Sequence, residues 1–280
     1  MVKVANTMLA LATLLCTACS SLDLGGLFDA QSPTIDERFA QSAAWNDSHP
    51  TRTLRIADDN YKVVFAADTH VGEHSVTLAA LVDASSDAAA LFILGDLTDS
   101  GQEYDAFAQQ TSSVANLFVT AGNHDLFFGG WSGYAARFGS SAYTVEIDTD
   151  EARDLYILFD TAGGTVGRQQ FAWIEQTLKE RRKDYRHCIV GSHTNIIKDD
   201  ISQLTSGNLP LDETYKLLKL FADYRVELSI EGHDHYRTTN HCRGVEYVTL
   251  DAACDAVANP SRLVISVGDK LTKEFAAILR

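Results

Sequence analysis

The sequence has little positive charge. Its 280 residues include 23 Lys and Arg against 38 Asp and Glu, which gives a formal net charge of −15 and a pI near 4.9. A protein that tracks along nucleic acid needs a basic face to contact the phosphate backbone. The composition therefore excludes nucleic-acid tracking, and an anionic substrate would need a local cation in its binding site.

Cysteine is also scarce, and no internal repeat or low-complexity tract is present. Besides two cysteines near the N-terminus, the chain has only Cys188, Cys242 and Cys254. In an oxidising compartment a Cys242–Cys254 disulfide is one option, but connectivity does not follow from sequence. Cys188 lies in an apolar run and is expected to be a small buried side chain. With 45% hydrophobic residues, the composition suits a globular protein of one large domain or two small ones.

An apolar run from Met8 to Leu15 lies near the N-terminus and follows the single charge of Lys3. This run is too short to span a bilayer, but it has the length of a signal-peptide core. We therefore expect residues 1–18 to be a signal peptide and the protein to be exported.

The run ends in Thr17-Ala18-Cys19, which resembles a bacterial lipoprotein signal. The resemblance implies that Cys19 is lipidated and anchors the protein to a membrane of the bacterial cell envelope. The two residues after Cys19 are Ser20 and Ser21 and not the Asp that retains such proteins in the inner membrane, which favours the periplasmic face of the outer membrane if the cell is Gram-negative. Cys16 stands where such signals prefer Leu, and an ordinary secretory signal cut near Ala18 is the alternative. Residues 19–60 are expected to form a tether or linker with a short amphipathic element.

Strand-like and helix-like segments alternate from Tyr61 onward, which indicates an α/β sheet and a domain over residues 61–280. Helices are expected near residues 75–83, 103–113, 171–178 and 211–222. After His235, the remaining strands are expected to be antiparallel and joined by turns such as Arg243-Gly244. The aromatic, glycine-rich stretch from Leu126 to Tyr134 has two interpretations, a substrate-pocket lining or a loop that packs its aromatic rings under the domain.

Five strand-like apolar runs each lead directly into Asp, Asn or His side chains. Ligands of open α/β sheets bind at the carboxyl ends of strands, so we expect these side chains to lie in one site. A single such histidine is usually a core or turn residue, but repetition at every strand end indicates metal binding. The side chains are Asp68 and His70, Asp96 and Asp99, Asn123 and His124, His193, and His233 and His235.

The chemistry of these groups narrows the choice of metal. The set contains carboxylates, imidazoles and one amide oxygen but no thiolate, which suits Mn, Fe or Zn in a site without cysteine ligands. Seven of these nine side chains, all except Asp99 and His124, are the candidate ligands, and seven are too many for one tetrahedral centre. They are about right for two metal ions that share one carboxylate.

The motifs Asp68-x-His70, Gly95-Asp96-x-x-Asp99, Gly122-Asn123-His124-Asp125, His193 and Gly232-His233-x-His235 together resemble the calcineurin-like metallophosphoesterase family. The resemblance implies a four-layer α/β sandwich, in which two facing mixed β-sheets are flanked by helices. It also implies two divalent or trivalent metal ions. One would be held by Asp68, His70, Asp96 and His235, and the other by Asp96, Asn123, His193 and His233.

The same resemblance implies that His124 faces the phosphate and the leaving-group oxygen, with Asp99 orienting its ring. The expected function is hydrolysis of a small phosphodiester or phosphomonoester by a metal-bridging hydroxide. A nucleotide- or lipid-type pyrophosphatase would use the same ligands, although His124 favours ester hydrolysis because an Arg often replaces it in lipid-sugar pyrophosphatases. A non-catalytic surface-binding lipoprotein is the third option. Ser192-His193-Thr194-Asn195 departs from the family pattern around the fourth motif, so subfamily specificity does not transfer.

Overall fold

The computed structural model describes residues 32–50, 52–198, 201 and 208–280. The expected signal peptide, Cys19 and the first part of the expected tether lie outside these residues. Within the described ranges, no helix is both long enough and apolar enough to cross a membrane.

A five-stranded sheet has the strand order β12-β11-β2-β3-β4. In this sheet β2, β3 and β4 are parallel, whereas β11 pairs antiparallel with both β2 and β12. Along β2, Val63 and Phe65 face the core between the sheets and Val64 faces the opposite side. This is the two-residue period of a strand buried on both faces. The strands are β2 (Tyr61–Ala66), β3 (Ala90–Leu94), β4 (Leu117–Thr120), β11 (Ser261–Val267) and β12 (Thr272–Ala277).

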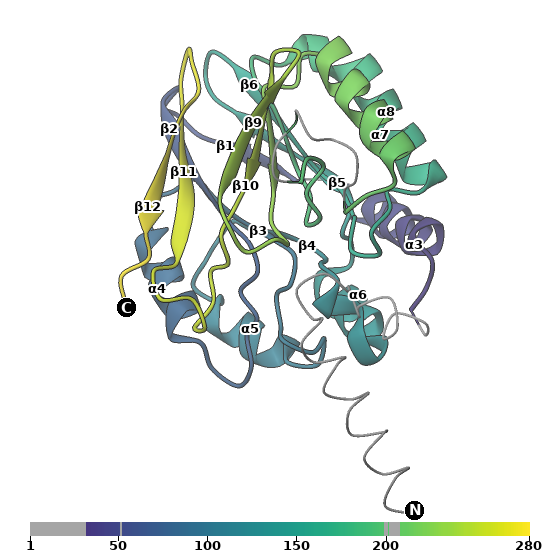
Figure 1. Ribbon diagram of the computed structural model, residues 1–280. Coiled ribbons are helices and arrows are strands. Elements are labelled where there is room, and N and C mark those ends of the chain that lie inside the picture. Colours follow the sequence, from purple (N-terminus) through teal and green to yellow (C-terminus); the bar gives the residue numbers. More distant parts are fainter. Residues whose placement is uncertain (1–31, 51, 199–200, 202–207) are drawn as a thin grey trace, which may run out of the picture.

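A seven-stranded sheet with the order β1-β5-β6-β7-β8-β10-β9 faces the first sheet (Figure 1). Its central strands β6, β7, β8 and β10 are parallel. The strand β5 runs antiparallel to β6 and parallel to β1, and β9 runs antiparallel to β10. Side chains of both sheets meet in one core, where the rings of Phe92 and Tyr156 stack at 5.1 Å. The strands are β1 (Thr53–Arg55), β5 (Tyr143–Asp148), β6 (Arg153–Leu158), β7 (Cys188–Gly191), β8 (Leu228–Glu231), β9 (Thr238–Cys242) and β10 (Val245–Thr249).

Helices cover the outer face of each sheet. Leu78, Phe107 and Tyr134 pack α4, α5 and α6 against the five-stranded sheet, whereas Ile174 and Leu217 pack α7 and α8 against the seven-stranded sheet (Figure 1). The expected α/β sandwich of two mixed sheets flanked by helices is therefore confirmed. The helices are α3 (Ile35–Ser48), α4 (Val76–Ala84), α5 (Tyr104–Gln110), α6 (Trp131–Phe138), α7 (Arg168–Arg181) and α8 (Leu211–Asp223), with short 3-10 turns η2 (His124–Gly129) and η3 (Arg182–Asp184).

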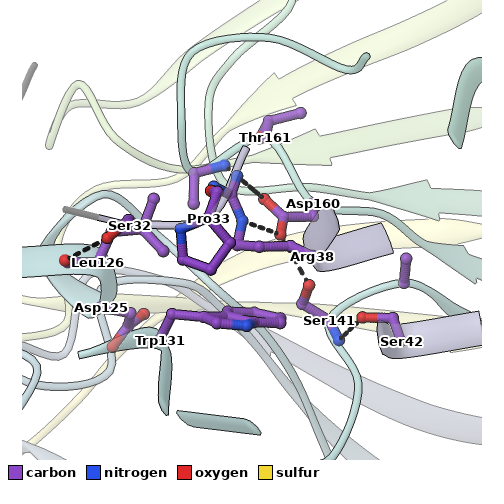
Figure 2. Close-up of polar contacts among 12 residues, drawn as sticks. Ser32, Pro33, Arg38, Ser42, Asp125, Leu126, Trp131, Ser141, Asp160 and Thr161 are labelled. Atoms are coloured by element: carbon purple, nitrogen blue, oxygen red, sulfur yellow. Dashed lines mark hydrogen bonds and ion pairs between the residues drawn. The ribbon is translucent and has the colours of Figure 1, made fainter. Parts of the chain in front are cut away.

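Residues 32–50 and 52–60, which were expected to belong to a tether, pack on the sandwich. In α3, the Arg38 side chain is 1% exposed and is held by the Asp160 carboxylate, with Nε 2.9 Å from Oδ2 and Nη2 3.1 Å from Oδ1 (Figure 2). The following strand β1 adds to the edge of the seven-stranded sheet by pairing with β5. The folded unit therefore begins well before the expected boundary at Tyr61.

The hairpin of β9 and β10 follows the expectation from its turn. Arg243 and Gly244 have φ values of 52° and 87°, and they join β9 to β10 in an antiparallel pair. Two consecutive residues with positive φ are typical of the type I′ hairpin turn. The chain end is not antiparallel throughout, however, because β10 also pairs in parallel with β8.

Candidate metal centre

The loops that follow the central strands of both sheets meet at one end of the sandwich. His233 N donates to both carboxylate oxygens of Asp68, at 3.2 and 3.0 Å, and thereby joins the loop after β8 to the loop after β2. Gly232 N donates to His193 O at 2.8 Å, which joins the loops after β8 and β7. The sheet edge predicted from the strand ends is therefore a single site built from both sheets.

One group of candidate ligands consists of Asp68, His70, Asp96 and His235. The Nε2 atoms of His70 and His235 lie 3.2 Å apart, and His235 Nε2 lies 3.5 Å from Asp68 Oδ1. Asp96 Oδ2 completes the group at 3.7 Å from His70 Nε2. These are the four side chains that the family resemblance assigns to one metal ion.

Asn123, His193 and His233 form a second group beside the first. Asn123 Oδ1 lies 2.9 Å from His193 Nε2 and 2.9 Å from His233 Nδ1, and the two ring nitrogens are 3.2 Å apart. Asp96 Oδ2 also lies 3.5 Å from His193 Nε2. One carboxylate oxygen is thus shared by both groups, as a bridging ligand requires.

The ring of His193 has the tautomer that a metal ligand needs. Its Nδ1 lies 3.0 Å from Leu94 O, which can only accept, so Nδ1 carries a proton and a neutral ring has its lone pair on Nε2. That lone pair points at Asn123 Oδ1, another acceptor. Two buried acceptors in contact need a cation or an added proton between them.

The spacing of the donor atoms also fits a metal ion. Ligands about 2.0–2.1 Å from a tetrahedral zinc-sized ion stand roughly 3.3 Å from one another. The nitrogen and oxygen atoms of the second group are separated by 2.9–3.2 Å. The donor types of both groups therefore fit a pair of metal ions. The tautomer of His193 and the distances between the donor atoms of the second group fit as well.

The charges of the cluster keep its shared carboxylate ionised. Burial opposes ionisation of Asp96, but His193 and His70 outweigh it and lower the pKa of the carboxyl group. Burial lowers the pKa of His70 and of His233, which favours neutral rings. Although His193 is fully buried, Asp96 and Asp68 raise its pKa, since a proton on this ring occupies the place of a cation. Metal binding would displace that proton.

The backbone of the site is held in a sparsely populated conformation. Left-handed φ values cost non-glycine residues about 1–3 kcal/mol each, and they concentrate at functional sites where the surrounding structure imposes them. Gly122 fits the same crowded region, because a Cβ there would lie 2.2 Å from both the N and the Oδ1 atom of Asp96. The candidate ligands with positive φ are Asp68 (56°), His70 (41°), Asp96 (48°), His233 (75°) and His235 (62°).

His124 lies beside the first group, with its ring 4.5 Å from that of His70. Its Nδ1 donates to the main-chain carbonyl of Asp99 at 2.7 Å, and its backbone N donates to Asp96 Oδ1 at 2.8 Å. The ring is therefore oriented by the main-chain carbonyl of Asp99 and not by its carboxylate, which is the group that the expected role of Asp99 implied. Because every residue has a main-chain carbonyl, this hydrogen bond could not be predicted from the sequence.

Asp125 belongs to the third sequence motif, but no role was expected for it. This buried carboxylate accepts hydrogen bonds from Gly122 N at 2.8 Å and from Leu97 N at 3.2 Å. Burial and the neighbouring Asp96 raise its pKa to about 7. Asp125 therefore ties the loop after β4 to the loop after β3.

The unusual fourth motif also gains a structural explanation. Asn195 Nδ2 donates to Asp234 Oδ2 at 2.7 Å, and Asn208 Nδ2 donates to Asp234 Oδ1 at 2.9 Å and to Asn195 Oδ1 at 2.6 Å. Asp234 lies between His233 and His235. The residue that departs from the family pattern thus helps to hold the loop carrying both histidines.

The aromatic stretch after His124 is divided between the core and the surface. Trp131 and Tyr134 are buried, as packing predicts, whereas the Phe127 ring lies 4.5 Å from the His124 ring and Phe128 is 67% exposed.

Elsewhere in the described chain, Cys188, Cys242 and Cys254 are free thiols.

A profile of the calcineurin-like phosphoesterase family matches residues 61–237, from β2 to the end of the His233-x-His235 loop. The chain belongs to the calcineurin-like phosphoesterase family. This family comprises dinuclear, metal-dependent phosphoester hydrolases. The group of Asp68, His70, Asp96 and His235 and the second group around Asn123 agree with this. No curated protein matches the sequence.

Several solved structures share the fold of this family member at low sequence identity. Purple acid phosphatase PPD1 from yellow lupin (Lupinus luteus) seeds is 15% identical over 80% of this chain, with a TM-score of 0.62. GAP50, the anchor in the inner membrane complex of Plasmodium, is 12% identical over 79% of the chain with a TM-score of 0.60, and 85% of GAP50 is covered. A putative 5'-nucleotidase from Staphylococcus aureus is 15% identical over 79% of the chain, with a TM-score of 0.56. The chain spans only 52% of the lupin enzyme and 55% of the nucleotidase.

Proposed function

We propose that this protein is an exported, metal-dependent phosphoesterase that hydrolyses a small phosphodiester or phosphomonoester. The observation that carries the proposal is the convergence of seven candidate ligands into two groups around Asp96 Oδ2, which lies 3.7 Å from His70 Nε2 and 3.5 Å from His193 Nε2. A protein that used this fold only as a binding surface would have no need to hold strained, buried carboxylates beside histidines.

In this proposal, Asp68, His70, Asp96 and His235 hold one metal ion, and Asp96, Asn123, His193 and His233 hold the other. Two bound cations, such as Mn, Fe or Zn ions, would supply Lewis acidity that polarises the phosphoryl oxygens and activates water. Their charge would also attract a phosphate ester at short range despite the net charge of −15.

His124 supplies the proton for the departing oxygen. Its Nδ1 proton is committed to Asp99 O at 2.7 Å, so a second proton on Nε2 is the one that the ring can donate. The same hydrogen bond fixes the plane of the ring, and the His124 backbone N on Asp96 Oδ1 at 2.8 Å fixes its position relative to the shared carboxylate. A positioned general acid of this kind contributes about 10²–10⁴-fold to a rate.

The location belongs to the proposal as well. Thr17-Ala18-Cys19 after an apolar run supports a lipoprotein anchored through Cys19 to a membrane of the cell envelope, with a soluble secreted form as the alternative. A non-catalytic role is the second candidate function, because GAP50, whose structure is similar, is itself described as an anchor.

A substrate panel tests the proposal. Purified protein, stripped of metal and reloaded with Mn²⁺, would be assayed with a nitrophenyl phosphomonoester, a bis-nitrophenyl phosphodiester and a pyrophosphate. We expect turnover of one of the esters by the wild type, and loss of both turnover and full metal occupancy in Asp96→Asn, since this residue serves both groups. Turnover of pyrophosphate alone would select the pyrophosphatase alternative. Full metal occupancy without turnover of any substrate would select the binding role.

A further inference from the structure

The two nitrogens of the His70 ring have very different surroundings. Nε2 faces the candidate ligands, at 3.2 Å from His235 Nε2 and 3.7 Å from Asp96 Oδ2. Nδ1 is buried and has no hydrogen-bond partner. A neutral imidazole that offers its Nε2 lone pair to a cation carries its proton on Nδ1. The first group of ligands therefore contains a buried N–H donor that still needs an acceptor.

The Asp99 carboxylate is in place to become that acceptor. Its Oδ1 lies 3.9 Å from His70 Nδ1, and the side chain is 70% exposed and so has room to rotate. A shift of about 1 Å would bring the two atoms to the 2.7–2.9 Å of a charge-assisted hydrogen bond. The carboxylate is not needed by His124, because the main-chain carbonyl of Asp99 already accepts the Nδ1 proton of that ring at 2.7 Å.

We propose that Asp99 positions two histidines with two different groups. Its carbonyl oxygen orients His124, and its carboxylate accepts the Nδ1 proton of His70 when His70 binds metal. The carboxylate then fixes the orientation of the His70 ring and makes the Nε2 lone pair a stronger metal ligand. Its effect is therefore on the affinity of the first metal site. The inference rests on the proposed metal centre. Removal of such a partner of a metal-ligating histidine lowers metal affinity by about 10–100-fold.

Metal titration of the apo protein tests this role without any substrate. Calorimetric titrations with Mn²⁺ would compare wild type, Asp99→Asn and the control Asp87→Asn. The control removes one exposed carboxylate of matched exposure, since the Asp87 side chain is 73% exposed and lies 3.7 Å from Lys62 Nζ. We expect Asp99→Asn to weaken one of the two binding steps by about 10–100-fold and Asp87→Asn to leave both unchanged. An equal effect of the two substitutions would reduce the role of Asp99 to net charge and overturn the inference.

Two background variants identify the affected site. Asn123→Ala removes a ligand of the second group only, and His235→Ala removes a ligand of the first group only. Asp99→Asn should still weaken the remaining binding step in Asn123→Ala and should have no effect in His235→Ala. The opposite pattern would contradict the assignment of the carboxylate to His70.

Leaving-group dependence provides a separate readout. If the carboxylate oriented His124 instead, Asp99→Asn would leave both metal affinities unchanged. It would slow the hydrolysis of alkyl esters much more than that of nitrophenyl esters. This result would overturn the inference. We expect the same relative loss for both esters at saturating metal. A protein that binds two metal ions with the predicted sensitivity to Asp99 but hydrolyses no ester would support this inference while refuting the proposed function.

Discussion

Replacement of Arg38 by Met should weaken the attachment of α3 to the sandwich and lower the stability of the protein. The Arg38 guanidinium donates to both oxygens of the Asp160 carboxylate at 2.9 and 3.1 Å, and both side chains are almost completely buried (Figure 2). Met keeps most of the length and apolar surface of Arg but leaves Asp160 as an uncompensated buried charge. Its remaining partners in the described structure are Ser141 Oγ and Ala162 N, both at 2.9 Å, and these are neutral donors.

Removal of one partner from a buried ion pair costs about 3–5 kcal/mol. A domain of this size changes its Tm by about 2–4 °C for each kcal/mol, so Arg38→Met should lower the Tm by roughly 10 °C. Urea unfolding followed by circular dichroism would give the corresponding loss in the free energy of unfolding. That loss is a large fraction of the roughly 5–15 kcal/mol that stabilises a typical native protein.

An exposed pair of the same two residue types provides the control. Arg137 in α6 pairs with Asp105, and their side chains are 42% and 93% exposed. Arg137→Met should cost no more than about 1 kcal/mol, because water screens the pair. A second replacement, Asp160→Leu in the Arg38→Met background, removes the orphaned charge and should recover part of the stability. If Arg38→Met costs as little as Arg137→Met, the buried pair does not hold α3 in place and our reasoning fails.

Three further predictions concern catalysis, location and pH. His124→Ala should keep both metal ions, since no ligand is lost, yet slow the chemical step by about 10²–10⁴-fold, less for nitrophenyl than for alkyl esters; loss of metal would make His124 a ligand. Cys19→Ser should move the protein from the membrane fraction to the soluble fraction, and an unlipidated, soluble wild type would refute the anchor. Burial opposes the charge of His187, but Glu227 Oε1 and Gly268 O, both 2.8 Å from its ring nitrogens, raise its pKa. The stability that this ring adds should therefore be complete below about pH 6.5 and lost as the pH rises through the raised folded-state pKa, so wild type and His187→Gln should converge in unfolding free energy at high pH; a constant difference would contradict this.

The fold was predictable because its signals are local and repeated. Runs such as Val63–Ala67 carry the hydrophobicity of strands buried on both faces, and each run ends in a polar residue at the same edge of a sheet. The bounds of β9 were not predicted, because Thr238–Cys242 has no apolar alternation and is fixed by pairing with β10. The helix α6 was missed since two glycines, Gly129 and Gly130, obscure its start.

The N-terminal boundary and the positioning contacts could not be read from residue types. Arg38 is an ordinary charged residue in the sequence, and only the folded chain brings it to Asp160, 122 positions away. The role of Asp99 was predicted for its side chain, whereas the bond to His124 is made by a carbonyl group that every residue has. Asn195 was visible only as a departure from a pattern, because its partner Asp234 lies 39 positions along the chain.

The close contact at Gly122 has a consequence for engineering this protein. Because any side chain at Gly122 would collide with Asp96, and Asp125 joins the same two loops, the metal side of the site tolerates little variation. Libraries aimed at new substrates should therefore leave Asp96, Gly122 and Asp125 unchanged. Phe128 is exposed and follows Phe127, whose ring lies 4.5 Å from that of His124, so we expect substitutions at Phe128 to change the surface beside His124 without removing a candidate ligand.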